Sequence, residues 1–385
     1  MSLLVLVPAP PAPGTGGGSL RMLQMLRFLG ARFDVDVVGP AQRGAAEAEQ
    51  ALRGACRSVE WVRPAAAPSR LRWSPYERDP ALARVVARRL ADGGYAAVQA
   101  EKPAMLPYVP RHGGVPLVLD TWAFGLAGAV RALRHERGAT RRALNLVRLA
   151  RFAAFDARWP ATYCILVVSE IDRERCARAW PRRRALVVPN GVDCAAVRPA
   201  AGPPDGPPLL MFSGDMSFAP NVEAAVTLAT RIFPAVRARH PGVQLRLVGR
   251  APAPRVRALA GAGVAVTGEV ADMTAQLQAA TVYVAPHDTG AGTRTKLLEA
   301  LAAGLPIVTT SVGIEGIEAI PENEVLIADD APAAVAAIVR LLDAPHERRR
   351  LGAAARRLAE RRYDWAACLE PLGGLYEALM PARVR

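Results

Sequence analysis

Two cations and one carboxylate stand close together in the segment GAGTRTKLLEALAAG, residues 290–304. Arg294, Lys296 and Glu299 lie at the start of a run of alanines and leucines that predicts a helix. The free N–H groups and the positive end of a helix favour an anion such as phosphate. Glu299 falls about one turn beyond Lys296, where a carboxylate could accept hydrogen bonds from a vicinal diol such as ribose. The segment therefore predicts a site for a diphosphate and a ribose.

The small residues before this helix support the same interpretation. Gly290 and Gly292 allow close approach of the backbone to a ligand, and Thr293 lies at the expected helix start. The open alternative is an ordinary helix capped by a threonine, with lysine and glutamate forming a surface pair.

A second glycine-rich loop, GTGGGS at residues 14–19, follows the apolar run LLVLVP. Its spacing partly matches a dinucleotide-binding loop, but the next expected strand, DVDVVGP, ends without the acidic residue that would bind a ribose. What remains is a flexible loop, Gly16, Gly17 and Gly18, whose N–H groups could approach a ligand.

Other catalytic patterns are missing from the sequence. The five histidines are scattered and the five cysteines form no C-x-x-C pair, so we expect no metal site, no resident cofactor and a reduced chain. Neither a Gly-x-Ser-x-Gly elbow nor a P-loop lysine is present.

Charge is distributed unevenly along the 385 residues. The net charge is +14, and residues 1–200 hold 30 Lys and Arg against 16 Asp and Glu, whereas the rest hold 19 of each. Residues 131–158 alone contain eight arginines interleaved with Leu149, Phe152 and Phe155, a mixture that suits an anionic membrane surface. A solvated helix whose aromatic residues pack under a neighbouring segment is the alternative. Nucleic acid fits less well, because no groove-binding motif accompanies the charge.

The N-terminus lacks the basic region of a signal peptide, and no stretch reaches the roughly 18 uninterrupted apolar residues of a membrane helix. We expect a cytoplasmic protein, with peripheral attachment to the inner face of the plasma membrane as an open possibility.

Short apolar runs alternate with helical patterns in both halves of the chain, which predicts α/β domains with parallel sheets. A stretch of five prolines and two glycines, residues 198–208, predicts a linker between them. We therefore expect an N-terminal Rossmann-like domain over residues 1–197 and a C-terminal one over 209–363. A terminal helix over 364–385 should pack back on the first domain. Two such domains would face each other across a cleft, where ligands are expected beyond the carboxyl ends of the strands.

The second half carries a family resemblance. The segments VVPNGVD, FSGDMSFAPNVEAA, VQLRLVGR, VAVTGEVADM, VYVAP and GAGTRTKLLEALAAGLPIVTTSVGIEGI, in this order, resemble the retaining glycosyltransferases of GT-B fold, family 4 or group 1. The likeness is dense from residue 185 to about 345, and the first half matches only in pattern.

The resemblance implies roles for particular residues. Glu299 would bind the donor ribose, and Arg294 and Lys296 would bind the diphosphate and stabilise the leaving group. The remaining donor contacts would come from main chain or small side chains: Gly16, Gly17, Gly18, Gly249, Gly268, Val270, Asp288, Gly290, Gly292 and Thr293.

Departures from the family pattern concern the sugar and the acceptor. Ala291 stands where the family has its first glutamate, so the contact with the transferred sugar is missing or has passed to Asp288. Asp215 and Asn221 replace the family's arginine and lysine after the first C-terminal strand. The acceptor-side histidine is replaced near Asp120 and Trp122 in LDTWAFG.

The resemblance implies a hexosyltransferase that uses a nucleotide-diphosphate sugar without metal and acts with retention on a polysaccharide or lipid-linked acceptor. Asp120 is the candidate for orienting the acceptor hydroxyl, with a helix cap as the alternative. Two other functions stay open: a nucleotide-sugar epimerase, and a non-catalytic protein that binds a nucleotide sugar or a partner.

Overall fold

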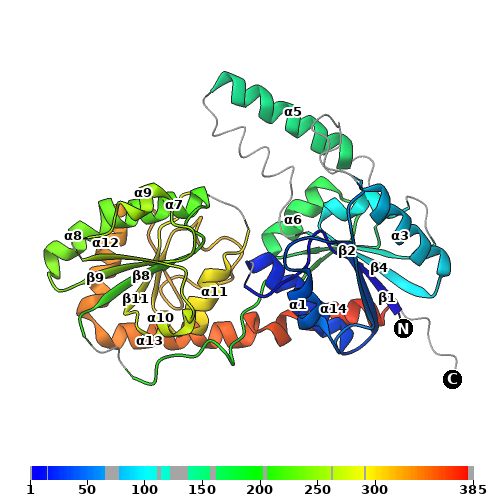
Figure 1. The fold of residues 1–385 in the computed structure, drawn as a ribbon. Helices are drawn as coiled ribbons and strands as arrows, with labels where there is room; N and C mark the ends of the chain where they lie inside the picture. The colour runs from blue at the N-terminus through cyan, green and yellow to red at the C-terminus, as the bar shows by residue number, and fades with distance from the viewer. Residues whose placement is uncertain are drawn as a thin grey trace. The chain divides into compact units, whose positions relative to one another are not determined.

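The computed structural model describes residues 2–14, 16–65, 78–110, 114–121, 138–156, 162–202, 206–261, 263–289 and 292–379. These residues form two compact units, each built on one parallel sheet with helices on both of its sides (Figure 1). The first unit holds Met1–Pro189 and Leu369–Arg385, and the second holds Asn190–Cys368.

The sheet of the first unit has seven strands in the order β3-β2-β1-β4-β5-β6-β7. Its strands are β1 (Ser2–Leu6), β2 (Asp34–Pro40), β3 (Ser58–Val62), β4 (Tyr95–Glu101), β5 (Leu117–Asp120), β6 (Cys164–Val167) and β7 (Ala185–Val187). Its helices are α1 (Gly17–Gly30), α2 (Ala45–Leu52), α3 (Pro80–Asp92), the 3-10 helix η1 (Pro103–Tyr108), α5 (Ala139–Asp156) and α6 (Glu170–Ala179). The chain returns in α14 (Trp365–Glu377), which begins in the second unit and ends in the first.

The sheet of the second unit has six strands in the order β10-β9-β8-β11-β12-β13. Its strands are β8 (Leu209–Ser213), β9 (Gln244–Val248), β10 (Val264–Gly268), β11 (Val282–Ala285), β12 (Ile307–Thr309) and β13 (Leu326–Ile327). Its helices are α7 (Ala219–Thr227), η2 (Leu228–Ile232), α8 (Phe233–Arg239), α9 (Pro254–Arg257), α10 (Met273–Gln278), α11 (Thr295–Ala302), α12 (Ala331–Asp343), α13 (Pro345–Leu358) and η3 (Ala359–Tyr363).

Both strand orders are those of doubly wound folds, in which the chain reverses its direction of winding between two central strands. The reversals fall between β1 and β4 and between β8 and β11. Ligands of open parallel sheets bind beyond the carboxyl ends of the strands at this point. The predicted α/β class is confirmed, and the end of β11 leads directly into the segment that holds Lys296 and Glu299.

The boundary between the units lies earlier than the expected position at residue 197. Residues 190–197 belong to the second unit because the chain leaving the first unit pairs there with the chain that returns. Val192 bridges Asp364, and Trp365 packs so closely against Gly191 that a Cβ on this glycine would lie 2.6 Å from the indole. The first part of α14 is therefore anchored in the second unit.

Strand β3 was not predicted. Its residues, SVEWV, are all only partly buried, and Glu60 binds Arg88 and Arg89 of α3. A polar strand at the edge of a sheet lacks the continuous apolar run by which the other strands were recognised.

The Arg-rich stretch near residue 140 forms α5. Residues 131–137 and 157–158 of the predicted segment lie outside the described part of the chain, and so do the side chains of Phe152 and Phe155. Along the described residues of α5, Leu144, Leu146 and Val147 are about half exposed. Arg141 and Arg142 are also exposed, and Arg141, Leu144 and Val147, three residues apart in turn, make one face of α5 both basic and apolar. Over the residues that the structure describes, no helix is long and apolar enough to cross a membrane.

Candidate functional site

The candidate site is built at the carboxyl ends of β8, β9 and β11 in the second unit. Gly214 follows β8 and Gly249 follows β9, and both have positive φ angles, 153° and 150°. A Cβ on Gly249 would lie 1.7 Å from the carbonyl oxygen of Gly214. The loops after these two strands can approach so closely because both positions are glycine. These two loops form the base of the candidate site.

The side chain of Lys296 lies against the loop that contains Gly214. Its Nζ donates a hydrogen bond to Asn221 Oδ1 at 2.5 Å and lies 4.9 Å from the centre of the Phe212 ring. A Cβ on Gly214 would come within 2.5 Å of Nζ, so Gly214 is the residue that gives the ammonium its place. Burial lowers the pKa of Lys296 to about 7, and the neighbouring Arg294 contributes to the shift.

Arg294 caps α11 rather than standing inside it. Its guanidinium donates to the carbonyl oxygens of Val312 at 2.6 Å, Gly313 at 3.1 Å and Thr289 at 3.0 Å. The side chain therefore ties together the two loops that follow β11 and β12. Its charge still acts on the site, as the lowered pKa of Lys296 shows.

Glu299 lies one turn into α11 and is partly buried. Burial raises its pKa to about 7, against the opposing effect of Lys296. Among the described residues, none donates a hydrogen bond to this carboxylate, so it is available to a ligand that brings hydroxyl donors. The ribose contact of Glu299 stays a prediction.

His287 is a member of the site that the sequence analysis left among scattered histidines. It follows β11 by two residues, is 1% exposed, and places Nε2 at 3.2 Å from Asn221 Oδ1. Burial lowers its pKa to about 3, and Lys296 and Arg294 act in the same direction. The imidazole is therefore neutral. Its position directly after a buried strand and before the glycine loop was the signal in the sequence.

The other predicted donor residues are placed as follows. Gly249 follows β9, Gly268 is the last residue of β10, and Val270 follows in the next loop. Asp288 is exposed in the loop after β11, Gly292 has a φ of 82°, and Thr293 Oγ1 donates to Gly316 O at 3.4 Å. Gly290 and Ala291 lie outside the described residues. Gly16, Gly17 and Gly18 are in the first unit, at the start of α1, where Gly16 caps the helix with a φ of 117°.

The two replacements after β8 have acquired their own partners. Asp215 forms an ion pair with Arg250 at 2.9 Å, and Ser217 also donates to its carboxylate, so the pKa of Asp215 is lowered. Asn221 becomes the common partner of Lys296 and His287. Across the described ranges, no three or more His, Cys, Asp or Glu residues are grouped as metal ligands would be.

Asp120 ends β5 in the first unit and is fully buried. Its two oxygens accept hydrogen bonds from Arg21 of α1 at 3.0 and 2.8 Å, and the same guanidinium donates to the carbonyls of Val188 and Pro189. Glu101, at the end of the neighbouring β4, is fully buried beside this pair, and burial and the Asp120 carboxylate raise its pKa well above the ordinary range. Trp122 lies outside the described residues.

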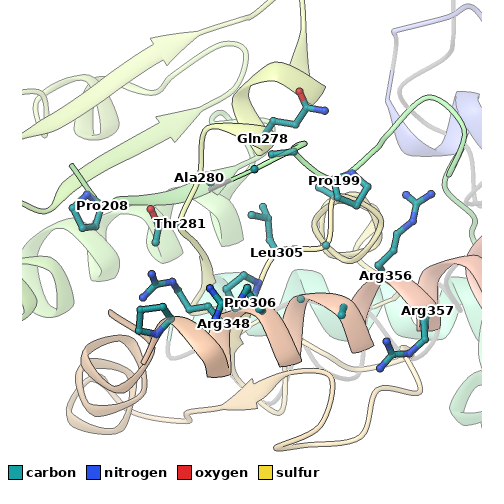
Figure 2. A pocket seen from close by; sticks show the side chains of 18 of the residues that line it. Pro199, Pro208, Gln278, Ala280, Thr281, Leu305, Pro306, Arg348, Arg356 and Arg357 are labelled. Carbon is teal, nitrogen blue, oxygen red and sulfur yellow. The ribbon is translucent and has the colours of Figure 1, made fainter. Parts of the chain in front are cut away.

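A separate cavity of about 740 Å³ lies at the opposite, amino edge of the second sheet (Figure 2). Pro208, Thr281 and Pro306 line it just before or at the starts of β8, β11 and β12, and α13 contributes Arg348 and Arg356. Both arginines donate to main-chain carbonyls. Lys296 and Glu299 lie at the carboxyl edge of the sheet, so this cavity at the amino edge is not part of the candidate site.

Two doubly wound units, one with a lysine, a helix N-terminus and a carboxylate at its reversal point, define the GT-B fold class. Solved structures agree. Over 98% of this chain and 99% of the other, sucrose-phosphate synthase from Thermosynechococcus elongatus matches with a TM-score of 0.74 at 21% identity. HepE of Anabaena, solved in complex with UDP-glucose, matches with a TM-score of 0.70 at 15% identity over 98% and 100%.

Family models give the narrower assignment. Residues 15–196 match "Glycosyltransferase Family 4" and residues 207–344 match "Glycosyl transferases group 1". The chain therefore belongs to these glycosyltransferases. The phosphatidyl-myo-inositol mannosyltransferase of Mycolicibacterium smegmatis is 31% identical over 57% of this chain, and that of Mycobacterium tuberculosis is 31% identical over 55%. The match spans 59% and 60% of the lengths of these relatives.

Proposed function

We propose that the chain is a hexosyltransferase that moves a hexose from a nucleotide-diphosphate sugar to a glycan or lipid-linked acceptor, with retention and without a metal. The observation that carries this proposal is the placement of Lys296, the N-terminus of α11 and Glu299 together at the reversal point of the second sheet. The mannosyltransferases among its relatives and the UDP-glucose bound to HepE support a nucleotide-sugar donor.

The chemistry follows from where charge develops. When the bond between sugar and diphosphate breaks, negative charge grows on the leaving phosphate, and a fixed cation with free N–H groups stabilises it. Lys296 and the start of α11 would supply these groups, while Arg294 holds the surrounding loops. With retention by front-face attack, a leaving phosphate oxygen takes the proton of the acceptor hydroxyl, so no side-chain nucleophile is needed.

Asp120 is proposed for the acceptor side of the reaction. Because Arg21 occupies both of its oxygens, Asp120 would act by fixing the carboxyl end of β5, and not by taking a proton from the acceptor.

The exposed basic and apolar face of α5 is proposed to contact an anionic membrane surface at the cytoplasmic side. Leu144 and Val147 would enter the interface while Arg141 meets anionic headgroups. Flotation with vesicles tests this: the protein should rise with vesicles containing phosphatidylglycerol and stay behind with vesicles of phosphatidylcholine alone. Equal behaviour with both would contradict the electrostatic part of the proposal.

Donor hydrolysis without acceptor tests the enzymatic function. The full chain is incubated with UDP-, GDP- and ADP-hexoses, and released nucleoside diphosphate is measured. We expect release above background from one donor class, and at least about a tenfold loss in Glu299→Ala, because a charged hydrogen-bond acceptor to ribose is removed. Tight donor binding with no release, also after addition of lipid or glycan acceptors, would favour a non-catalytic nucleotide-sugar-binding protein.

A further inference from the structure

The ammonium of Lys296 is held by a neutral group. Its hydrogen-bond partner is the carboxamide oxygen of Asn221, and its other close neighbour is the face of Phe212. Among the described residues, no carboxylate lies within ion-pair distance of Nζ. A cation kept in a partly buried place usually has an anionic partner, so this arrangement leaves its charge uncompensated.

Both polar atoms of the Asn221 carboxamide have hydrogen-bond partners. Its Nδ2 donates to the main-chain carbonyl of Asp215 at 2.9 Å, so Oδ1 must face Lys296 and His287. Because Oδ1 can only accept, the proton of the neutral His287 ring is on Nε2, and Nδ1 is left as a buried atom without a partner. The His287 ring packs edge-on against Phe212 with centroids 5.4 Å apart, which holds the histidine in turn.

The charged groups that face Lys296 do not supply the missing anion. Arg294, at the N-cap of α11, is a like charge and lowers the pKa of Lys296. Glu299 on the same helix and Asp215 after β8 act in the opposite direction, but burial outweighs both. Asp215 is already paired with Arg250.

We propose that Asn221 is a positioning residue that holds Lys296 with a neutral oxygen, braced by His287, so that the ammonium charge of Lys296 is left for the donor diphosphate. This inference rests on the proposed function, since the diphosphate is its ligand. A carboxylate at position 221 would neutralise Lys296 in advance, and a lysine there would repel it.

One consequence is proton uptake on binding. In the free chain Lys296 is a mixture of amine and ammonium near pH 7, and an arriving diphosphate stabilises the ammonium. The amine therefore takes a proton from the buffer as the anion binds, and the contribution of Lys296 to binding becomes weaker as the pH rises above about 7.

Lysine scarcity makes this directly measurable, because Lys102 and Lys296 are the two lysines of the sequence. In protein labelled with ¹³Cε-lysine, two Cε signals are followed against pH, and Lys102→Arg assigns them. We expect Lys296 to titrate near 7, and its pKa to rise by about one unit or more when UDP is added. In Asn221→Asp the pKa should rise by about two units in the free chain, because an opposite charge now lies in contact.

Asn323→Asp, the same change at an exposed asparagine, is the control and should leave both titrations as they are. A wild-type Lys296 that titrates near its ordinary value of 10.5 would overturn the inference, and so would an unchanged pKa in folded Asn221→Asp. If both free-chain titrations are as expected but UDP, GDP and ADP all leave Lys296 unmoved, the positioning role stands and the proposed transferase function fails.

Discussion

At the scale of single residues, the charged forms of Lys296 and Glu299 lower the stability of the folded chain, because burial disfavours both charges. The folded chain raises the pKa of Glu299 from 4.5 to about 7, so its charged form is disfavoured, and the cost grows as the pH rises between these values. It lowers the pKa of Lys296 from 10.5 to about 7, so that cost is complete below 7 and disappears towards 10.5. Both costs are present together near pH 7, where a bound nucleotide would relieve them.

Glu299→Gln should therefore stabilise the free chain while weakening nucleotide binding. At pH 8 we expect a gain of about 1–2 kcal/mol, less than the full pKa shift would give, because the side chain is partly exposed. The gain should shrink as the pH falls from 7 to 4.5, since Glu299 is then protonated in both states. Urea unfolding at several pH values measures it.

Glu49→Gln, on an exposed position of α2, is the matched control and should show no such pH-dependent gain. A Glu299→Gln chain that is less stable than wild type at pH 8 would show that the carboxylate has a stabilising partner and is not poised for a ligand.

At the scale of elements, the loops after β8 and β9 lie so close together that Gly249 has no room for a side chain. Gly249 and Gly268 both have positive φ and both lie at the carboxyl end of a strand, but their surroundings differ. A Cβ on Gly249 meets Gly214 O at 1.7 Å, whereas a Cβ on Gly268 meets nothing within 4 Å.

This contrast gives a matched pair of substitutions. Gly268→Ala should cost about 1 kcal/mol, the price of a left-handed backbone alone. Gly249→Ala should cost about 2–5 kcal/mol, because the loops must also move apart, and it should displace Lys296 by shifting Gly214. Chemical denaturation measures the costs, and equal losses in the two variants would contradict the close approach of the loops.

Much of the fold was predictable because buried parallel strands appear as continuous apolar runs. The carboxyl-edge placement of the segment with Arg294, Lys296 and Glu299 was also predictable, because it directly follows such a run. Strand β3 was missed because its residues are half-buried. The side-chain contacts were not predictable: Asn221 and Lys296 are 75 residues apart, and nothing in the local pattern of either indicates the other.

At the scale of the whole molecule, the chain runs from the first unit to the second and back. The return segment, the end of α14, is built into the core of the first unit through Tyr376. Its hydroxyl donates to Gln99 Oε1, whose Nε2 in turn donates to Glu101, and its ring contacts Phe33 edge-on with centroids 6.0 Å apart. The first unit therefore needs the last helix of the chain.

Tyr376→Ala should weaken the first unit selectively. Loss of a fully buried aromatic ring costs about 3–5 kcal/mol, whereas Tyr376→Phe should cost about 1–3 kcal/mol by leaving Gln99 without its donor. Hydrogen exchange followed by mass spectrometry should show faster exchange in β1 and β4 and unchanged exchange in β8 and β9. A uniform increase in both units would mean that they unfold as one.

Arg21 has a consequence for engineering. Its guanidinium donates to the carbonyls of Val188 and Pro189, the last residues before the chain leaves the first unit. A β-bridge between Val192 and Asp364 joins the start of the second unit to its end. Residues 190–368 therefore form a unit that contains this bridge and can be exchanged between relatives as one piece. A chimaera that exchanges donor specificity between relatives should take residues 190–368 as one piece and keep residues 369–385 of the host, so that the second junction falls within α14. A cut at the proline linker would instead take Val192 and Asp364 from two different parents.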